Sequence, residues 1–180
     1  NNADITGLAY VGGITGQLGA QFKGSNIVSG NLINVTNNGT VTATSKSFAE
    51  AGGIVGQLAY GDITYAANRG NVSAPLKEED IYSKVIGYNY SGGLIGYKLG
   101  GTIENAYNSG EVNTHTEYQL IGSMKNATAN NLYNIGDSTK LVALENGGDI
   151  STVYAVDKVT ASELSDAYTD NEKHQTKDWS

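Results

Sequence analysis

The sequence has few of the residues on which most catalytic and metal chemistry depends. Its 180 residues include no cysteine, one proline, one tryptophan and two histidines. Without cysteine there is no disulfide framework, no thiolate chemistry and no zinc site of the zinc-finger type. The two histidines, His115 and His174, lie far apart in sequence with no acidic residue at ligand spacing. We therefore expect no metal centre and no bound cofactor.

Charged residues are also scarce, at 16% of the chain against about 25% in typical soluble domains. The net charge is −7, and the 11 basic residues are scattered. Nucleic acids and anionic membrane surfaces both attract clustered Lys and Arg, so the sequence predicts neither as a partner. It contains no apolar run of about 18 residues and no basic start followed by an apolar core. We expect neither a membrane span nor a signal peptide in it.

The residues that are abundant favour strands and turns. The chain has 24 glycines and 12 tyrosines. Aromatic and β-branched residues fit pleated strands, whereas Gly and Asn favour turns. The composition therefore predicts a β-rich protein of extracellular type, and 180 residues suffice for one domain with a hydrophobic core.

A glycine-rich motif recurs at a constant interval of 40 positions, as GGITG at residues 12–16, GGIVG at 52–56 and GGLIG at 92–96. Two further landmarks keep this interval, Ile63 with Ile103 and Asn68 with Asn108. A fixed period of this length is typical of solenoids, in which each coil buries its apolar face against its neighbours. The sequence predicts an all-β fold, a parallel β-solenoid of about four to five coils, in the form of a right-handed β-helix.

The repeat divides the chain into a solenoid domain, residues 1–158, and a C-terminal cap, residues 159–180. The predicted units lie near residues 12–51, 52–91, 92–117 and 118–142, with a partial unit at 143–158. The fourth unit is degenerate, because Tyr118 and Gln119 replace its glycine pair. In the cap, Thr160 and Glu163 fit a capping box, which predicts a short helix over residues 161–168 that covers the end of the stack.

Strand alternation predicts which side chains of the motif share a face. In the second unit, it places Ile54, Gly56 and Leu58 on one face. Val55 and Gln57 then lie on the opposite face.

The strand that follows the motif shows three recurring features. Ile63 and Ala66 are the expected inward pair, and their odd spacing breaks strict alternation, which indicates a bend between them. Tyrosines at an equivalent position are expected to stack coil on coil, namely Tyr107, Tyr133 and Tyr154. Asparagines recur two residues before a glycine, where Asn tolerates left-handed dihedrals and can bond its own backbone, namely Asn68, Asn108 and Asn134.

The third unit carries the clearest family resemblance. It joins GGLIG at residues 92–96 to IENAYNSGEV at 103–112, and this pattern resembles the GLUG motif. That repeat is found in large bacterial surface and secreted proteins, among them IgA-specific metallopeptidases of Gram-positive bacteria and haemagglutinin-like adhesins. The resemblance covers roughly residues 12–157 and implies a β-solenoid module of an extracellular multidomain protein. It carries over no catalytic residue, since the motif is structural in this family and no His-Glu-x-x-His occurs here.

Two groups of acidic residues are candidates for chemistry. Asp62 and Glu104 would stack in adjacent coils, and paired carboxylates about 5–9 Å apart can hydrolyse glycosides. Each lies beside a turn at a variable position, which favours a solvated exterior. Glu78, Glu79 and Asp80 could ligate calcium, but calcium loops interleave Asp with Gly and backbone ligands, and this run does not. We expect a solvated loop there.

The largest insertion, residues 73–91, contributes most of the candidate ligand surface. Tyrosines cluster in it and just after it, namely Tyr82, Tyr88, Tyr90 and Tyr97. Tyrosine beside Asn and Ser is typical of sugar-binding and protein-binding surfaces, because the ring supplies contact area at low entropic cost. The alternative is that these tyrosines only cover the core.

Together these features favour a non-enzymatic structural or adhesive β-solenoid module of a bacterial cell-surface or secreted protein. Such a module is expected to be monomeric and to present neighbouring domains of its parent chain, with host glycan or protein as candidate ligands. The alternative is an accessory domain that positions the substrate of a secreted IgA-type zinc metallopeptidase. A polysaccharide-degrading β-helix enzyme is a third class, disfavoured because the sequence shows no catalytic constellation.

Overall fold

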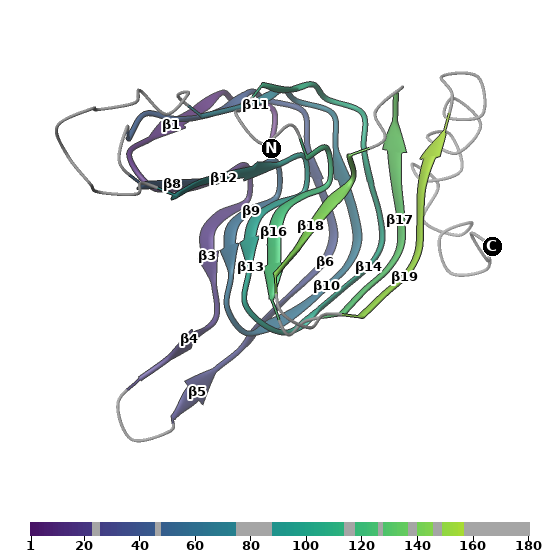
Figure 1. Ribbon diagram of the computed structural model, residues 1–180. Coiled ribbons are helices and arrows are strands. Elements are labelled where there is room, and N and C mark those ends of the chain that lie inside the picture. The colour runs from purple at the N-terminus through teal and green to yellow at the C-terminus, as the bar shows by residue number, and fades with distance from the viewer. Residues whose placement is uncertain are drawn as a thin grey trace, which may run out of the picture.

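The computed structural model describes residues 1–22, 26–45, 48–74, 88–113, 118–125, 128–136, 140–145 and 149–156. Within these residues all regular structure is β-strand, and no helix is present. The strands form stacked parallel sheets, an arrangement consistent with a β-solenoid (Figure 1). The predicted all-β class and parallel stacking are therefore confirmed. The predicted helix at 161–168 and the rest of the cap, 159–180, lie outside the described residues.

Each turn of the chain passes through up to four sheets. We number them I to IV in the order in which the chain reaches them from Tyr10 on; the preceding strand belongs to sheet IV. Sheet I contains β2 (Tyr10–Gly12), β8 (Phe48–Gly52) and β12 (Tyr88–Gly92). Sheet II contains β3 (Thr15–Leu18), β9 (Val55–Leu58), β13 (Ile95–Lys98), β16 (Ile121–Lys125) and β18 (Val142–Glu145). Sheet III contains β6 (Gly30–Asn37), β10 (Gly61–Asn68), β14 (Thr102–Asn108), β17 (Thr128–Ile135) and β19 (Asp149–Val156). Sheet IV contains β1 (Ile5–Gly7), β7 (Val41–Ala43), β11 (Val72–Ser73) and β15 (Val112–Asn113).

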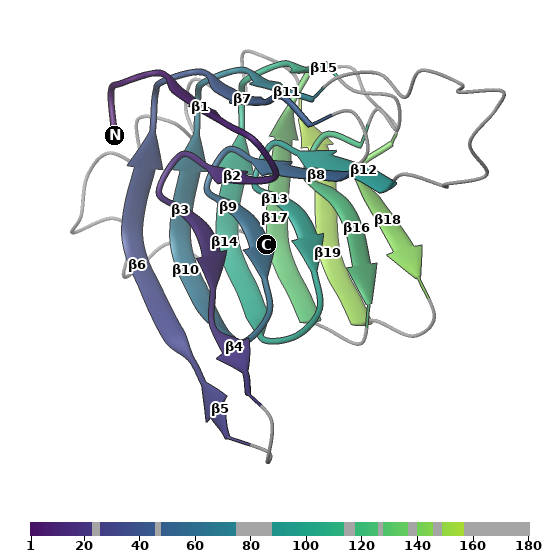
Figure 2. The same ribbon diagram turned by 90° about the vertical axis from the view of Figure 1, so that its left-hand side faces the viewer.

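Strands stack in the order in which the chain makes them. Sheet III runs β6–β10–β14–β17–β19, and Figure 2 shows these strands side by side along the stack. Ile63 pairs with Ile103 and Asn68 with Asn108, so the 40-residue sequence interval is the register of neighbouring coils. The antiparallel pair among the described residues is a hairpin of β4 (Ala20–Gln21) and β5 (Ile27–Val28), which projects from the first coil (Figures 1 and 2).

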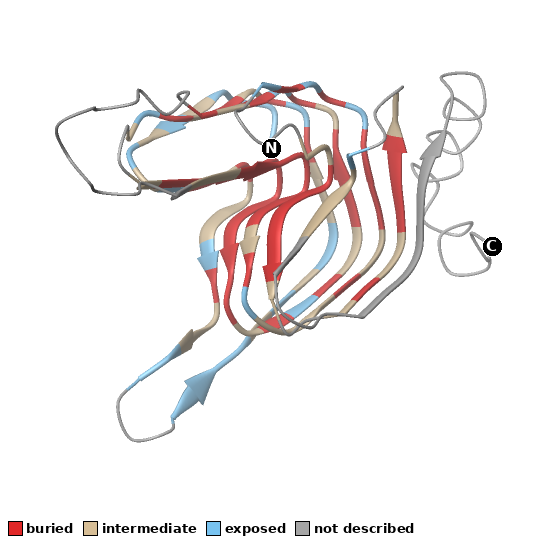
Figure 3. Cartoon of the chain, viewed as in Figure 1, coloured by how far each residue is buried: buried red, intermediate tan, exposed pale blue. Residues whose placement is uncertain are grey.

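Two hydrophobic clusters fill the interior of the stack. The larger lies between sheets II and III and is built from rows of equivalent apolar residues in successive coils, such as Ile54, Leu94 and Leu120. The smaller packs sheet I against sheet IV through Ala51 and Val72. Figure 3 shows that buried residues recur at the same places in successive coils. Each coil therefore completes the core of its neighbour.

The predicted alternation within the motif is wrong at one position. Ile54, Val55 and Leu58 all belong to the core between sheets II and III, so Val55 does not lie on the face opposite Ile54 and Leu58. The strand register pairs Val55, Gln57 and Leu58 with the next coil and skips Gly56. A Cβ on Gly56 would lie 2.7 Å from the backbone nitrogen of Val11 in sheet I. The glycine allows two backbone layers to touch, and this contact interrupts the alternation of the strand.

The predicted bend in the following strand is confirmed. Ile63 and Ala66 are both fully buried, and Tyr65 between them has a left-handed φ of 58°. Asn105 and Asn131 repeat this conformation in later coils, with φ of 54° and 49°. The left-handed residue rotates the strand so that two side chains three apart face the same core.

The asparagines before the turn bond their own backbone, as the sequence indicated, and they do so without a left-handed φ. The left-handed positions lie three residues earlier, and the predicted asparagines instead form a buried ladder through the stack. Each side-chain Nδ2 donates to the Oδ1 of the next coil, at 2.9 Å from Asn37 to Asn68, 2.8 Å from Asn68 to Asn108 and 3.0 Å from Asn108 to Asn134. Each Nδ2 also donates to the carbonyl two residues on, as at 2.7 Å from Asn68 to Gly70. These bonds satisfy buried amides and fix the coil register.

The second glycine of each motif makes room for this ladder. A Cβ on Gly93 would lie 2.1 Å from Cγ of Asn108, and one on Gly53 would lie 2.2 Å from Cγ of Asn68. A side chain at either position would overlap the asparagine. The second glycine of the motif therefore leaves the space that the asparagine of its own coil occupies. The motif is therefore a structural device in these coils.

The predicted tyrosine column is present for two of its members. Tyr107 pairs with Tyr133 in register, and both pack with Ala67 in a small buried cluster. Arg69 donates a 2.8 Å hydrogen bond from Nε to the Tyr107 hydroxyl. Tyr154 continues the column in backbone register, and its side chain lies outside the described residues.

Candidate ligand-binding surface

Tyr90 and Tyr97 are brought together where sheet I meets sheet II. Their rings stack with centroids 4.9 Å apart and an interplanar angle of 14°. Tyr90 lies on β12, whose next residue, Ser91, is fully buried, and Tyr97 lies on β13 beside the buried Lys98. Alternation turns both rings away from the core, and the 92–96 turn folds them toward each other.

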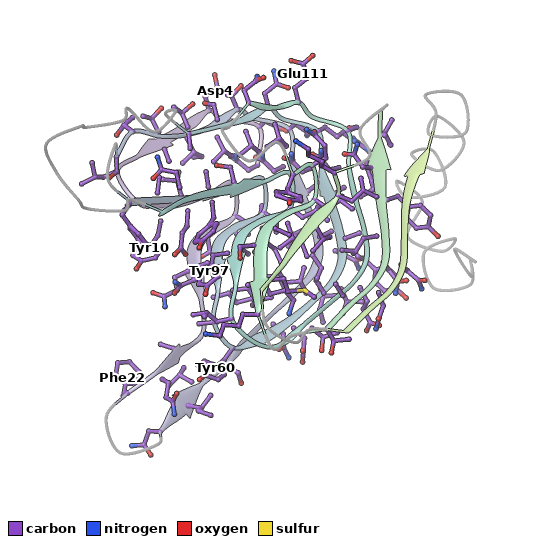
Figure 4. The ribbon with its side chains drawn as sticks, viewed as in Figure 1. Asp4, Tyr10, Phe22, Tyr60, Tyr97 and Glu111 are labelled. Atoms are coloured by element: carbon purple, nitrogen blue, oxygen red, sulfur yellow. The ribbon has the colours of Figure 1, made fainter. Side chains whose placement is uncertain are left out.

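The same corner carries equivalent side chains in the two preceding coils. Tyr10 and Glu50 share the strand position of Tyr90, and Gln17 and Gln57 share that of Tyr97. We call these six residues the corner cluster. Gln17 donates a 2.9 Å hydrogen bond from Nε2 to Oε1 of Gln57. Figure 4 shows Tyr10 and Tyr97 on the outer side of this corner.

Glu50 is the buried acid of the corner cluster, with 1% of its surface exposed. Burial raises its pKa from 4.5 to about 7, although a hydrogen bond from Gln57 works in the opposite direction. Its Oε2 has no hydrogen-bond partner among the described residues. Burial, with the nearby Glu50 charge, also raises the pKa of Tyr10.

Replacing Glu50 with glutamine is expected to flatten the pH dependence of stability in acid. Since the pKa is raised in the folded state, the contribution of Glu50 is full below about pH 4.5 and is lost as the pH rises to about 7. The slope approaches about 1.4 kcal/mol per pH unit. Urea unfolding of the wild type and Glu50→Gln between pH 4 and 8 measures this difference. Glu111→Gln, at an exposed carboxylate, is the control, and parallel profiles for all three proteins would disprove the assignment.

Tyr10 is the open aromatic end of the corner. Its ring is 46% exposed and meets Phe48 edge to face, with centroids 5.3 Å apart. Edge-to-face pairs hold aromatic rings in place at a surface. Tyr10 therefore extends the aromatic surface toward the first coil.

The structure places the four predicted tyrosines differently. It brings together Tyr90 and Tyr97, and it pairs Tyr88 with Phe48 in sheet I, although the Tyr88 side chain is outside the described residues. Tyr82 lies outside the described residues, as do His115, His174 and the acidic run 78–80. That the surface binds a ligand stays a prediction.

The sequence reasoning missed Tyr10, Glu50 and Gln57. The signal that finds them is the repeat interval itself, since positions 10, 50 and 90 form one column and 17, 57 and 97 form another. The sequence places Tyr90 in the insertion, residues 73–91, and Tyr97 just after it, whereas both occupy regular strand positions of the third coil.

Asp62 and Glu104 do not stack on each other. Asp62 pairs with Thr102, and Glu104 pairs with Thr64, so the two carboxylates stand in neighbouring rows of sheet III. Both line a shallow depression of about 310 Å³ on the outer face of that sheet. Among the described residues, no group of three or more His, Cys, Asp or Glu side chains could hold a metal ion.

Lys98 is a second buried ionisable group that the sequence reasoning missed. It has no exposed surface and occupies the strand position of Leu58 and Met124 in the neighbouring coils. Its Nζ donates to the carbonyls of Gly100, at 2.9 Å, and Gly101. Burial lowers the pKa of Lys98 from 10.5 to about 7, and the charge of Asp62 opposes this shift. The sequence contains the signal for it, because Lys98 stands at the repeat interval of 40 residues after Leu58, where a leucine is expected.

These observations define a β-rich repeat domain, and comparison with known proteins identifies the repeat. Residues 87–113 match the family described as the GLUG motif, which confirms the resemblance inferred from the sequence. The match spans β12 to β15, the coil that contains Tyr90 and Tyr97. A search of the curated proteins gives no match.

In fold, the chain is similar to the crystal structure of a protein from Bacteroides ovatus described as a "putative immunoglobulin A1 protease". The TM-score is 0.57 and the sequence identity is 19%, so the similarity concerns the fold alone. It covers 89% of this chain and 49% of that one, and the chain thus spans about half the length of its relative. No helix among the described residues is long and apolar enough to cross a membrane.

Proposed function

We propose that this GLUG-repeat domain is a non-enzymatic module of a larger cell-surface or secreted bacterial protein, where it presents neighbouring domains and binds host glycan or protein through the corner cluster. The observation that carries the proposal is the stack of Tyr90 on Tyr97, two partly exposed rings outside the core. Around it, the repeated polar positions are used in ladders such as that of Asn68 and Asn108. The proposal includes a monomeric state and no nucleic acid or membrane as partner.

The finer fold prediction belongs to the same proposal. It is a right-handed solenoid of about four to five coils, closed by a helix over residues 161–168. Parallel strands joined by crossovers are right-handed in about 98% of cases, which supports this handedness.

The non-enzymatic part of the proposal is tested by direct assay. The folded chain is incubated with neutral and acidic polysaccharides and with immunoglobulin A, and new reducing ends and peptide fragments are measured. We expect neither product to form. Turnover that disappears in Asp62→Asn or Glu104→Gln would make the domain an enzyme and would refute this part.

A second candidate function is an accessory domain that positions the substrate of an IgA-type zinc peptidase. The observation that favours it is the fold similarity to the Bacteroides ovatus protein. If the parent chain carries a zinc-peptidase motif, removal of the solenoid should raise KM for an immunoglobulin substrate and leave cleavage of a short peptide unchanged. A parent chain with further repeats, a cell-wall anchor and no peptidase supports the first function instead.

A further inference from the structure

The outer face of sheet III carries a depression that no ladder or core position accounts for. It has a volume of about 310 Å³ and is lined by Asn31, Ile33, Asp62, Thr64, Thr102 and Glu104. These residues come from β6, β10 and β14, which lie side by side in Figure 2. The depression is therefore built by three successive coils. It lies on sheet III, whereas the corner cluster lies on sheets I and II.

The lining residues form two rows with one residue per coil, Asn31–Asp62–Thr102 and Ile33–Thr64–Glu104. Internal hydrogen bonds hold the first row in place. Asp62 Oδ1 accepts from the backbone nitrogen of Thr102 at 3.1 Å, and Asn31 Oδ1 accepts from that of Asp62 at 3.4 Å. These bonds leave the second carboxylate oxygen of Asp62 and the amide nitrogen of Asn31 available to a ligand. The strand backbone thus fixes the polar groups before any ligand arrives, which lowers the entropic cost of binding.

Three side chains of the depression have polar groups with no hydrogen-bond partner within the described residues. They are the hydroxyls of Thr64 and Thr102 and the carboxylate of Glu104. Ile33, at the end of the second row, is 63% exposed. Convergent donors and acceptors beside an apolar side chain are typical of a small-molecule site.

The chemistry of the lining selects the ligand class. Two carboxylates and no basic side chain line the depression, so it repels anionic polymers, and the nearby Lys98, which interacts with Asp62, is fully buried. A cationic side chain would use the carboxylates and leave the hydroxyls and the amide unpaired. Sugar hydroxyls both donate and accept, and they match all five polar groups, while the C–H face of a sugar can rest on Ile33. Because coils repeat at about 4.8 Å, a polymer of repeating units can use successive coils.

We infer that this depression is a binding site for a neutral oligosaccharide. The site is separate from the ligand surface of the proposed function, and each stands without the other. The inference concerns binding alone and requires no turnover.

Affinity electrophoresis of the folded chain tests the inference. The gels contain a soluble glucan, mannan or galactan, polygalacturonate as the anionic polymer, or polylysine as the cationic one. Variants Thr64→Val and Glu104→Gln keep side-chain size; the first removes a hydroxyl, and the second replaces a charged acceptor oxygen with an amide donor. Glu111→Gln is the matched control, because its carboxylate is exposed near sheet IV, away from the depression. Thermal unfolding of every variant verifies the fold.

We expect at least one neutral polymer to retard the wild type, and polygalacturonate to leave it unaffected. Thr64→Val and Glu104→Gln should weaken binding at least tenfold, whereas Glu111→Gln should bind as the wild type does. The inference is overturned if no neutral polymer binds, if Thr64→Val and Glu104→Gln bind as tightly as the wild type, or if polylysine is the preferred polymer. Neutral-polymer binding that is kept in both site variants and lost in a Tyr90→Ser, Tyr97→Ser double variant would support the corner cluster and refute the depression.

Discussion

Replacing Gly93 with alanine is expected to destabilise the domain by about 3 kcal/mol or more, a large share of the stability of an ordinary domain. The three atoms nearest to a Cβ at this position all belong to Asn108, at 2.1 to 2.4 Å. The asparagine cannot move away, because its Nδ2 is bonded to Gly110 at 2.8 Å and to Asn134 at 3.0 Å. Chemical unfolding of the purified variant measures the loss.

A double-mutant cycle with Asn108→Ala isolates the cause of this loss. Asn108→Ala alone should cost about 3 kcal/mol, since it leaves buried amides of the ladder unpaired. In that background Gly93→Ala should cost much less, giving a coupling of about 2 kcal/mol. Gly30→Ala is the control, because its nearest neighbour is the tip of the Leu18 side chain at 2.9 Å. Equal costs of Gly93→Ala in both backgrounds would show that the glycine does not serve the asparagine.

Replacing Lys98 with methionine is expected to stabilise the domain at pH 6 by about 1–3 kcal/mol, because it removes a charge from an apolar column. Met124 already occupies the same position in the next coil. The folded pKa of Lys98, about 7, lies below its ordinary value of 10.5. Its contribution to stability is therefore full above about pH 10.5 and is lost as the pH falls to about 7. The advantage of Lys98→Met should shrink by about 1.4 kcal/mol per unit as the pH rises from 7.

The buried lysine and the buried glutamate act in adjoining pH ranges. Glu50 loses its stabilising contribution between about pH 4.5 and 7, and Lys98 gains its contribution above about pH 7. The wild type should accordingly show a stability minimum near neutral pH. Glu50→Gln should remove the acid side of this minimum and Lys98→Met the alkaline side, while Lys125→Met, at the end of β16, should change neither. Superimposable profiles for the wild type and Lys98→Met would contradict the lysine assignment.

Periodicity alone predicted the parts of the fold that repeat. The interval between Ile63 and Ile103 is the register of sheet III, and the odd spacing of Ile63 and Ala66 correctly indicated a bend. Both features follow from one-dimensional spacing, because neighbouring coils of a solenoid present equivalent residues side by side.

The errors arose where one coil segment touches another. Alternation could not foresee that Gly56 lies against the backbone of sheet I, and this contact turns Val55 inward. Local turn propensity also allowed a left-handed Asn68, but a buried amide gains more by bonding the next coil. The corner cluster was missed for the same reason. Glu50 and Tyr90 are distant in sequence and become neighbours because they occupy equivalent positions of adjacent coils.

A binding measurement distinguishes a corner cluster that holds the ligands of this domain from tyrosines that only cover the core. Wild type and the Tyr90→Ser, Tyr97→Ser double variant are applied to arrays of host glycans and host proteins, with Tyr60→Ser as a control at a tyrosine outside the cluster. We expect the wild type and Tyr60→Ser to bind the same ligands. The double variant, still folded, should lose at least tenfold in affinity for those ligands that Thr64→Val binds normally. Unchanged binding by the folded double variant, or the absence of any ligand for the wild type, would contradict this expectation.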